Sequence, residues 1–223
     1  ALGTVITTTN AASKKSRSIS NALGQLIAVD EPDSTGALPA LPQSTPVPSP
    51  TPSGTPSPHG QCISQCPPNF TGGEYPSYST FYDYNSQGKL VKVTQGDQKR
   101  FFLYDSLGRL IRVRQPEQEI NASLERLDPF TGNKDWTAGF TYDLLGNVLT
   151  ATDAKGIVTH NEYDRGNRLT RRYYTGEPSG QTTPEVTFWY DGKGLASQQS
   201  PNYATGKLTK VTSSVSETEN SLF

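Results

Sequence analysis

A short frame that contains an aspartate, YDSLGRL at residues 104–110, recurs along the chain and is the first candidate for chemistry. Repeated carboxylates suggest a pair for general acid–base work, the arrangement that glycosidases use. However, the slot of Asp105 is filled by Asn85 in one copy and by Asn21 in another. Because an amide cannot do the work of a catalytic acid, we expect these residues to serve the structure.

Other catalytic patterns are missing from the sequence. The two histidines, His59 and His160, stand alone, and there is no His-x-x-x-His, no Gly-x-Ser-x-Gly and no glycine-rich phosphate loop. We therefore predict no enzyme activity, no catalytic residue, no cofactor and no metal site.

Two cysteines, Cys62 and Cys66, lie four residues apart near His59. A local disulfide between them is expected if the chain is secreted, and two free thiols are nearly as well supported. A zinc site is the weakest of the three interpretations, since too few further ligands are at hand.

The composition excludes several classes of partner. Only 32% of the residues are hydrophobic, and the mean hydropathy is −0.60. The chain has 20 basic and 21 acidic residues, so its net charge is close to zero. That balance gives no electrostatic footprint for nucleic acid, and no apolar run is long enough for a membrane span. There is no signal-peptide pattern at the N-terminus and no methionine, so we expect a processed piece or an excised segment of a longer protein.

Residues 31–80 differ in character from the rest of the chain. Proline alternates there with serine and threonine, and large apolar residues are scarce. Such a tract cannot bury a core, so we expect a solvated insertion or linker; an O-glycosylated stalk and a proline-rich docking peptide are the alternatives. This divides the chain into a degenerate repeat hairpin at 1–30, the insertion with its cysteine pair at 31–80, and a hairpin array at 81–223.

The frame repeats with its tyrosine at position zero. Copies start at the following residues: Tyr84, Tyr104, Tyr142, Tyr163 and Tyr190, with a tyrosine-free copy at Ser20. The spacings of the tyrosine copies are 20, 38, 21 and 27 residues. We expect one unit of about 20 residues, and we interpret the spacing of 38 as a doubled unit whose middle turn is degenerate.

Each frame predicts a hairpin turn. Asp or Asn at position one opens a type I turn, and a residue with left-handed backbone at position four closes it with a bulge. In the Tyr163 copy, position four is Asn167, the non-glycine type that best tolerates that conformation. The predicted turn residues are Asn85, Gly88, Asp105, Gly108, Asp143, Gly146, Asp164, Asn167, Asp191 and Gly194.

The strands on either side of the turn are amphipathic. Aromatic residues alternate upstream, as in Phe102 and Tyr104 or Phe140 and Tyr142, and position six is nearly always aliphatic. Rings at every second residue line one face of a sheet and can stack from hairpin to hairpin. The sequence therefore predicts an all-β fold of consecutive antiparallel β-hairpins.

With these features the chain resembles the YD-repeat, or RHS (rearrangement hotspot), family, weakly over residues 1–30 and well over 81–223. The resemblance implies a twisted β-sheet ribbon, of which this chain supplies an arc of a shell or spiral. Relatives include polymorphic toxins, encapsulating components of insecticidal toxins, wall-associated proteins and teneurins. It implies a structural segment of a large secreted or cell-surface protein, whose partners are the rest of the parent chain or further copies.

Two finer points follow from the resemblance. Some relatives carry an aspartyl autoprotease with two Asp-Pro dipeptides, but here Asp128-Pro129 is the only one, so we expect a loop between hairpins and no autocleavage. Carbohydrate or partner binding is the alternative function, with Tyr173, Tyr174 and Trp189 as the residues that would stack on a glycan. Asn69 and Asn121 fit the N-glycosylation sequon.

Overall fold

The computed structural model describes residues 2–39, 41, 79–193, 205–213 and 217–219. The chain folds as two compact units, Ala1–Lys99 and Arg100–Phe223. Some residues named above lie outside the described part: His59, Cys62, Cys66, Asn69 and Gly194.

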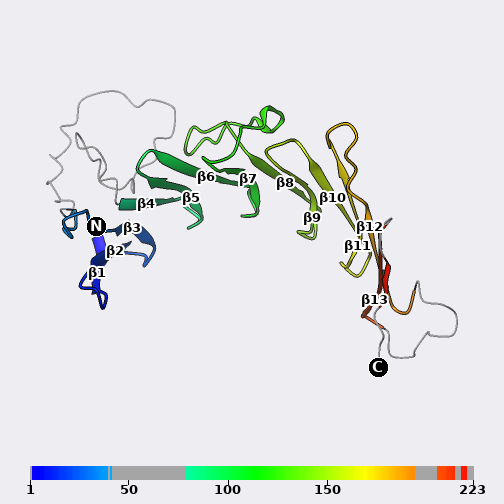
Figure 1. Cartoon of the computed structure of the whole chain (residues 1–223), viewed down its shortest axis with the longest axis horizontal. Helices are drawn as coiled ribbons and strands as arrows, with labels where there is room; N and C mark the ends of the chain where they lie inside the picture. Colours follow the sequence, from blue (N-terminus) through cyan, green and yellow to red (C-terminus); the bar gives the residue numbers. More distant parts are fainter. Residues whose placement is uncertain (1, 40, 42–78, 194–204, 214–216, 220–223) are drawn as a thin grey trace, which may run out of the picture. The chain divides into compact units, whose positions relative to one another are not determined.

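Both units consist of antiparallel strands that pair in chain order (Figure 1). The strands of the first unit are β1 (Leu2–Thr9), β2 (Lys15–Asn21), β3 (Leu26–Asp30), β4 (Ser79–Tyr84) and β5 (Leu90–Gln95). The remaining strands are β6 (Gln98–Tyr104), β7 (Leu110–Arg114), β8 (Ala138–Tyr142), β9 (Val148–Thr152), β10 (Val158–Tyr163), β11 (Leu169–Thr175), β12 (Val186–Tyr190), β13 (Leu208–Ser213) and β14 (Glu217–Glu219). The described residues hold no α-helix, only the 3₁₀ turn η1 (Ala122–Leu124). The all-β class and the consecutive antiparallel hairpins are thereby confirmed.

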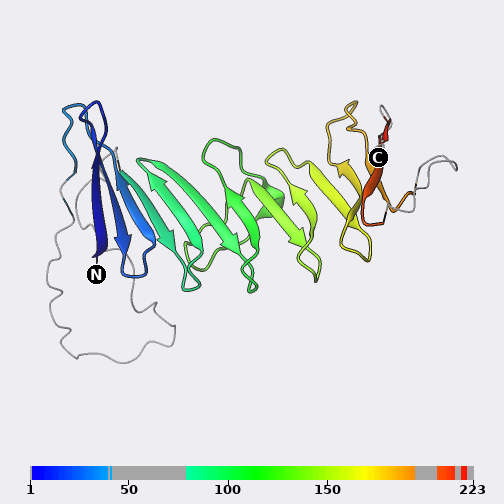
Figure 2. The same cartoon turned by 90° about the horizontal axis from the view of Figure 1, so that it is seen from below.

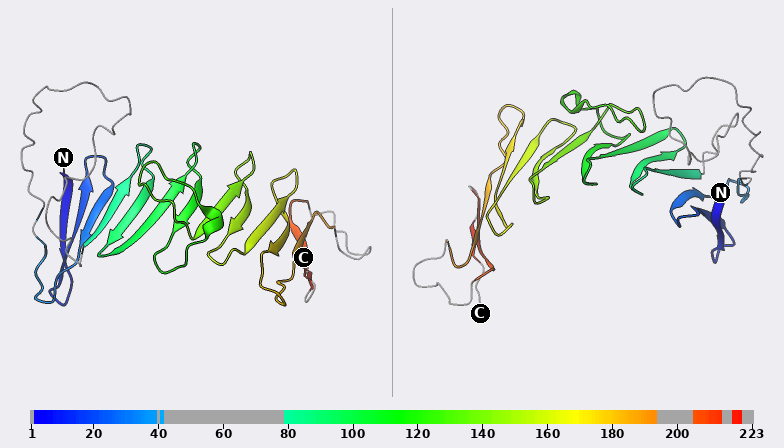
Figure 3. Two further views of the ribbon diagram at one scale, coloured as in Figure 1. Left: turned by 90° about the horizontal axis from the view of Figure 1, so that it is seen from above. Right: turned by 180° about the vertical axis from the view of Figure 1, so that it is seen from behind.

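Successive turns fall at opposite edges of the sheet, because antiparallel neighbours follow one another in the chain. In the second unit, the frame turns that join β6 to β7, β8 to β9 and β10 to β11 therefore share one edge (Figures 2 and 3). We call this the frame edge. The first unit has a frame edge of its own, which holds the turns after β2 and β4. The opposite edge of the second unit carries the longer connections, residues 115–137 and 176–185.

Residues 1–30 hold the hairpin of β2 and β3, and β1 pairs with β2 as a third strand. One expectation from the sequence needs correction. The spacing of 38 residues is not a doubled unit, since residues 115–137 form one long connection between β7 and β8 instead of a further hairpin. The proline breaks the strand pattern at Gln115-Pro116, and the following residues pack on the sheet.

That connection supplies the main apolar cluster of the second unit. Trp136 is fully buried and packs with Leu124, Leu103 and Ile111. The indole N–H of Trp136 donates to the carbonyl of Arg126 at 2.7 Å, which satisfies its polar group. A single layer of strands gains a small core by folding its own connection over one face.

A close approach of backbones at the opposite edge yields a test of the fold. Gly176 has φ +81°, and a Cβ there would lie 2.5 Å from the carbonyl oxygen of Gly156. Gly180 has a similar φ of +83° with open space around it. Gly180→Ala should cost about 1 kcal/mol of unfolding free energy from backbone strain alone, and Gly176→Ala should cost clearly more. Urea unfolding measures both; equal losses would contradict the packing described.

Candidate functional site at the frame edge

The turn at Asp105 shows the geometry of the frame. Its Oδ1 accepts hydrogen bonds from the backbone N–H groups of Leu107 at 3.0 Å and Arg109 at 2.9 Å. Gly108, with φ +75°, donates its N–H to the carbonyl of Asp105. Three backbone groups of the turn are thus satisfied by one residue, which is the work expected of a turn aspartate.

Other copies place their predicted residues in the same way. Oδ1 at position one accepts from the N–H groups two and four residues on, at Asn85, Asp143 and Asp164. Position four has positive φ in each: Gly88 at 75°, Gly146 at 92° and Asn167 at 65°. An amide oxygen serves as well as a carboxylate here, which explains why Asn and Asp alternate.

The copy at Tyr190 departs from the predicted turn. Asp191 itself has φ +61°, and its N–H donates to the carbonyl of Lys207 at 3.1 Å. Its carboxylate accepts from the N–H of Gly206 at 2.7 Å. Asp191 is therefore the second residue of a tight turn that begins at Tyr190, where the Lys193 N–H donates to the Tyr190 carbonyl at 3.0 Å, instead of the residue that opens the turn.

Three turns of the same kind were missed from the sequence. Asn10, Asp33 and Asp153 each accept, through Oδ1, the N–H groups two and four residues on. None follows an aromatic residue, and Asp33 lies within the tract predicted to be a linker. The spacing from Asp or Asn to a Gly or Ser three residues later was the available signal.

The tyrosine at position zero joins one repeat to the one before it. Its hydroxyl donates to the backbone carbonyl of the residue at position six of the preceding copy. The four pairs are Tyr84 to Leu26 at 2.8 Å, Tyr142 to Leu110 at 2.6 Å, Tyr163 to Val148 at 3.1 Å and Tyr190 to Leu169 at 3.0 Å. Sequence reasoning assigned these tyrosines to ring stacking and missed the bond.

Position five makes a second link to the following repeat. The Arg109 guanidinium lies 4.8 Å from the ring centroid of Tyr142, and its Nη1 donates to the carbonyl of Asp143 at 2.8 Å. Arg168 lies 4.5 Å from the ring centroid of Tyr190 and binds both carboxylate oxygens of Asp191. Each arginine therefore stacks on the tyrosine and binds the aspartate of the next copy.

The same arginines also bind the aspartate of their own turn. Nε of Arg109 donates to Asp105 at 2.7 Å, and Nε of Arg168 donates to Asp164 at 2.8 Å. In the copy between them, position five is Asn147, whose Nδ2 donates to Asn167 of the next repeat at 2.5 Å. A polar side chain at position five thus links successive turns even where the charge is absent.

These contacts shift the acidity of the turn carboxyls. The Asn147 side-chain amide lowers the pKa of Asp143, and the Arg168 guanidinium lowers the pKa of Asp164. The fork of hydrogen bonds from Arg168 lowers the pKa of Asp191 from 3.8 to about 2. All three groups are therefore held as carboxylates and act as hydrogen-bond acceptors.

The three aromatic residues predicted to stack on glycans do not share a surface. Tyr173 and Tyr174 are consecutive on β11, so their rings point to opposite faces. Tyr173 stacks on His160 at 4.6 Å and lies under Arg171 at 4.5 Å. Trp189 on β12 is 38% exposed. Glycan binding by Trp189 stays a prediction.

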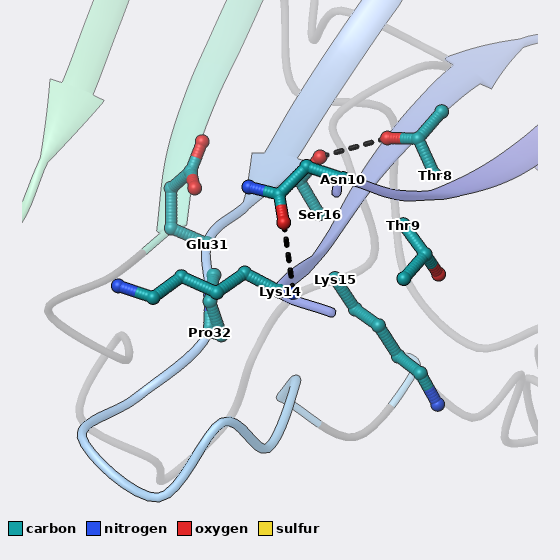
Figure 4. Close-up of a pocket in the computed structure, with 8 residues that line it drawn as sticks. All are labelled: Thr8, Thr9, Asn10, Lys14, Lys15, Ser16, Glu31 and Pro32. Carbon is teal, nitrogen blue, oxygen red and sulfur yellow. Dashed lines mark hydrogen bonds between the residues drawn. The ribbon is translucent and has the colours of Figure 1, made fainter. Parts of the chain in front are cut away.

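Two hollows are open to solvent, and neither gathers catalytic groups. The first, about 200 Å³, lies at the β1–β2 turn, where Asn10 binds the Lys14 N–H and Thr8 pairs with Ser16 at 2.9 Å (Figure 4). The second, about 430 Å³, lies over β8 to β11 between Phe140 and Tyr174. Among the described residues there is no group of three or more His, Cys, Asp or Glu suited to a metal ion.

Asp128 and Asn121 both have structural partners. The Asp128 carboxylate is 2% exposed and accepts from the Phe130 N–H at 2.9 Å and from the Thr131 hydroxyl. Asn121 is 8% exposed, and its Nδ2 donates to the carbonyl of Asp153 at 2.9 Å. An N-linked glycan would be attached at the same Nδ2, which is buried here against the Asp153 carbonyl.

Comparison with known proteins finds a family whose model matches this chain. The model of the family described as Teneurin YD-shell matches residues 72–210, more than half of the chain. No curated protein matches the sequence. No helix in the part of the chain that the structure describes is long and apolar enough to cross a membrane.

Similar solved structures come from toxin complexes. A Photorhabdus luminescens Tc holotoxin pore shares 13% identity over 61% of this chain and 5% of its own, with a TM-score of 0.42. A TcdB2–TccC3 structure shares 15% identity over 61% of this chain and 6% of its own, with a TM-score of 0.43. The present chain thus spans only a small part of the length of either.

Removal of one tyrosine hydroxyl tests the link between repeats. Tyr142→Phe deletes the donor to the Leu110 carbonyl and keeps the ring, so the free energy of unfolding should fall by about 1 kcal/mol. Tyr173→Phe is the matched control, because Tyr173 contacts its neighbours through the ring. Denaturant unfolding reports both, and an equal effect of the two changes would count against the link.

Acid should weaken the frame edge. A carboxyl whose pKa is lowered by folding contributes stability above its unfolded pKa and loses it as pH falls through the folded value. For Asp191 this window runs from pH 3.8 down to about 2. The urea midpoint of the wild type should therefore fall more steeply across this window than that of Asp191→Asn. The control, Asp97→Asn at an exposed turn, should keep the wild-type slope.

Proposed function

The chain belongs to the Teneurin YD-shell family. On that premise, we propose that it is a structural segment of a large secreted or cell-surface protein. In that protein, its repeats build the wall of a β-sheet shell. One observation carries this proposal. In four pairs of adjacent copies the tyrosine hydroxyl of one repeat binds the backbone of the repeat before it. The resemblance to YD-repeat proteins is confirmed, and a scaffold role follows from the family.

The chemistry of the frame supports a scaffold without catalysis. The turn aspartates use their oxygens on backbone N–H groups and on arginines. A catalytic carboxyl needs an oxygen free for a substrate, and a pKa near the working pH. Here the pKa values of Asp143, Asp164 and Asp191 are lowered instead. We accordingly propose that the chain is not an enzyme and needs no cofactor.

The partners follow from the architecture. A single layer of strands with a small core depends on neighbouring strands for burial. We propose that these come from the rest of the parent chain or from further copies. The parent protein would then enclose a toxin for delivery or form an extracellular fibre.

Electron cryomicroscopy of the parent protein tests this function. The proposal expects residues 79–213 in a continuous β-sheet wall, with tyrosine-to-carbonyl contacts repeated along it. A closed wall around density would indicate encapsulation, and a long open assembly would indicate a fibre. A separate globular domain at these residues would overturn the proposal.

A glycan-binding surface is the second candidate, favoured by the exposure of Trp189. A glycan array with the wild type and Trp189→Ala distinguishes it from a scaffold. Saturable binding that the variant loses would establish the candidate, while equal signals from both proteins would exclude Trp189 from it.

A further inference from the structure

In the first unit, β3 and β4 pair across a very long connection. β3 ends at Asp30 and β4 begins at Ser79, and these two residues lie directly opposite each other although residues 31–78 separate them in the chain. In a hairpin with a short loop, the turn itself sets the register of the strands. A connection of this length imposes no register of its own, so other contacts must select it.

A row of three polar side chains crosses the strands at this point. Arg17 on β2 lies opposite Asp30, and its Nε donates to Oδ2 of Asp30 at 2.7 Å. The Ser79 hydroxyl donates to Oδ1 of the same carboxylate, also at 2.7 Å. The two oxygens of Asp30 therefore bind the strands on either side of β3, one oxygen for each strand. We call this row of Arg17, Asp30 and Ser79 the clasp.

The clasp is shielded from solvent. All three residues are buried, and Ser79 is only 1% exposed. A buried carboxylate is costly without its partners, because it has lost its hydration. A shift of β4 by one residue would turn Ser79 to the opposite face of the sheet and leave Oδ1 of Asp30 without this donor. The clasp therefore favours one register of β4 on β3.

The start of the connection is tied to the same guanidinium. Nη2 of Arg17 donates to the carbonyl of Pro39. Before it, Asp33 forms a turn in which its Oδ1 accepts the N–H groups of Thr35 and Ala37. The contacts that hold β3 beside β4 thus come from residues up to Pro39 and from the start of β4 onward. They need no covalent continuity between these two points.

We propose that the clasp keeps β3 and β4 paired independently of the connection between them. The first unit therefore stays whole when the connection is cut, and the two pieces of the chain remain one particle. Neither piece contains the complete clasp, since Arg17 and Asp30 belong to one and Ser79 to the other. An array with such a clasp accepts an insertion between two repeats without loss of the sheet, whether or not the parent protein is a shell.

Cleavage of the full chain tests the clasp. The recognition sequence of a site-specific protease replaces residues 50–56, and mass spectrometry confirms complete cutting. We expect the two pieces to elute together in size-exclusion chromatography at micromolar concentration, with a Tm close to that of the uncut protein. Separation of the pieces under these conditions would overturn the proposal.

Variants show whether the clasp, and not the backbone ladder alone, joins the pieces. The affinity of the pieces is measured by dilution of the cut protein in the analytical ultracentrifuge. Ser79→Ala removes the donor to Asp30 and should weaken the affinity about tenfold. Arg17→Lys keeps the charge without the planar fork and should also weaken it. Ser16→Ala is the matched control, because the Ser16 hydroxyl pairs with Thr8 within one piece. Wild-type affinity in both clasp variants would refute the role of the clasp.

Discussion

The bond from a tyrosine hydroxyl to the carbonyl of the preceding repeat is the contact on which the array depends. Each frame hairpin contains a bulge next to its turn, and in the second unit the pairing shifts register between Leu103 and Tyr104. A bulge interrupts the ladder and leaves backbone groups without a strand partner. The Leu110 carbonyl at this bulge receives the hydroxyl of Tyr142. One side chain of the following repeat thus binds a backbone carbonyl beside the turn of the previous repeat.

The two arginine links both run from one copy of the frame to the following copy. Arg109 and Arg168 bind the aspartate of their own turn and then reach the next copy in the chain. The tyrosine hydroxyls donate in the opposite direction, to a carbonyl of the preceding copy, so polar links between adjacent copies run both ways. Since the apolar core is small, much of the order along the frame edge comes from these nearest-neighbour contacts, as in other repeat proteins.

Local features of the fold were predictable from the sequence, and contacts between repeats were not. A turn such as that at Asp105 is fixed by five adjacent residues, so spacing alone predicted it. The link from Arg168 to Asp191 joins residues that are 23 positions apart, and the frame gives no sign of it. Asp191 differs from the aspartates of the other copies, because its backbone has φ +61° within the turn and its carboxylate binds Arg168 of the preceding copy and the Gly206 N–H.

A double-mutant cycle between Arg109 and Tyr142 tests most directly whether adjacent repeats stabilise each other through the frame. The unfolding free energies of Arg109→Gln, Tyr142→Leu and the double variant give the coupling between the two side chains. We expect about 0.5–1 kcal/mol for a partly exposed cation–π pair. The same cycle with Tyr163, which Arg109 does not stack on, should be additive. Additivity for Arg109 and Tyr142 as well would contradict a stabilising link between these repeats.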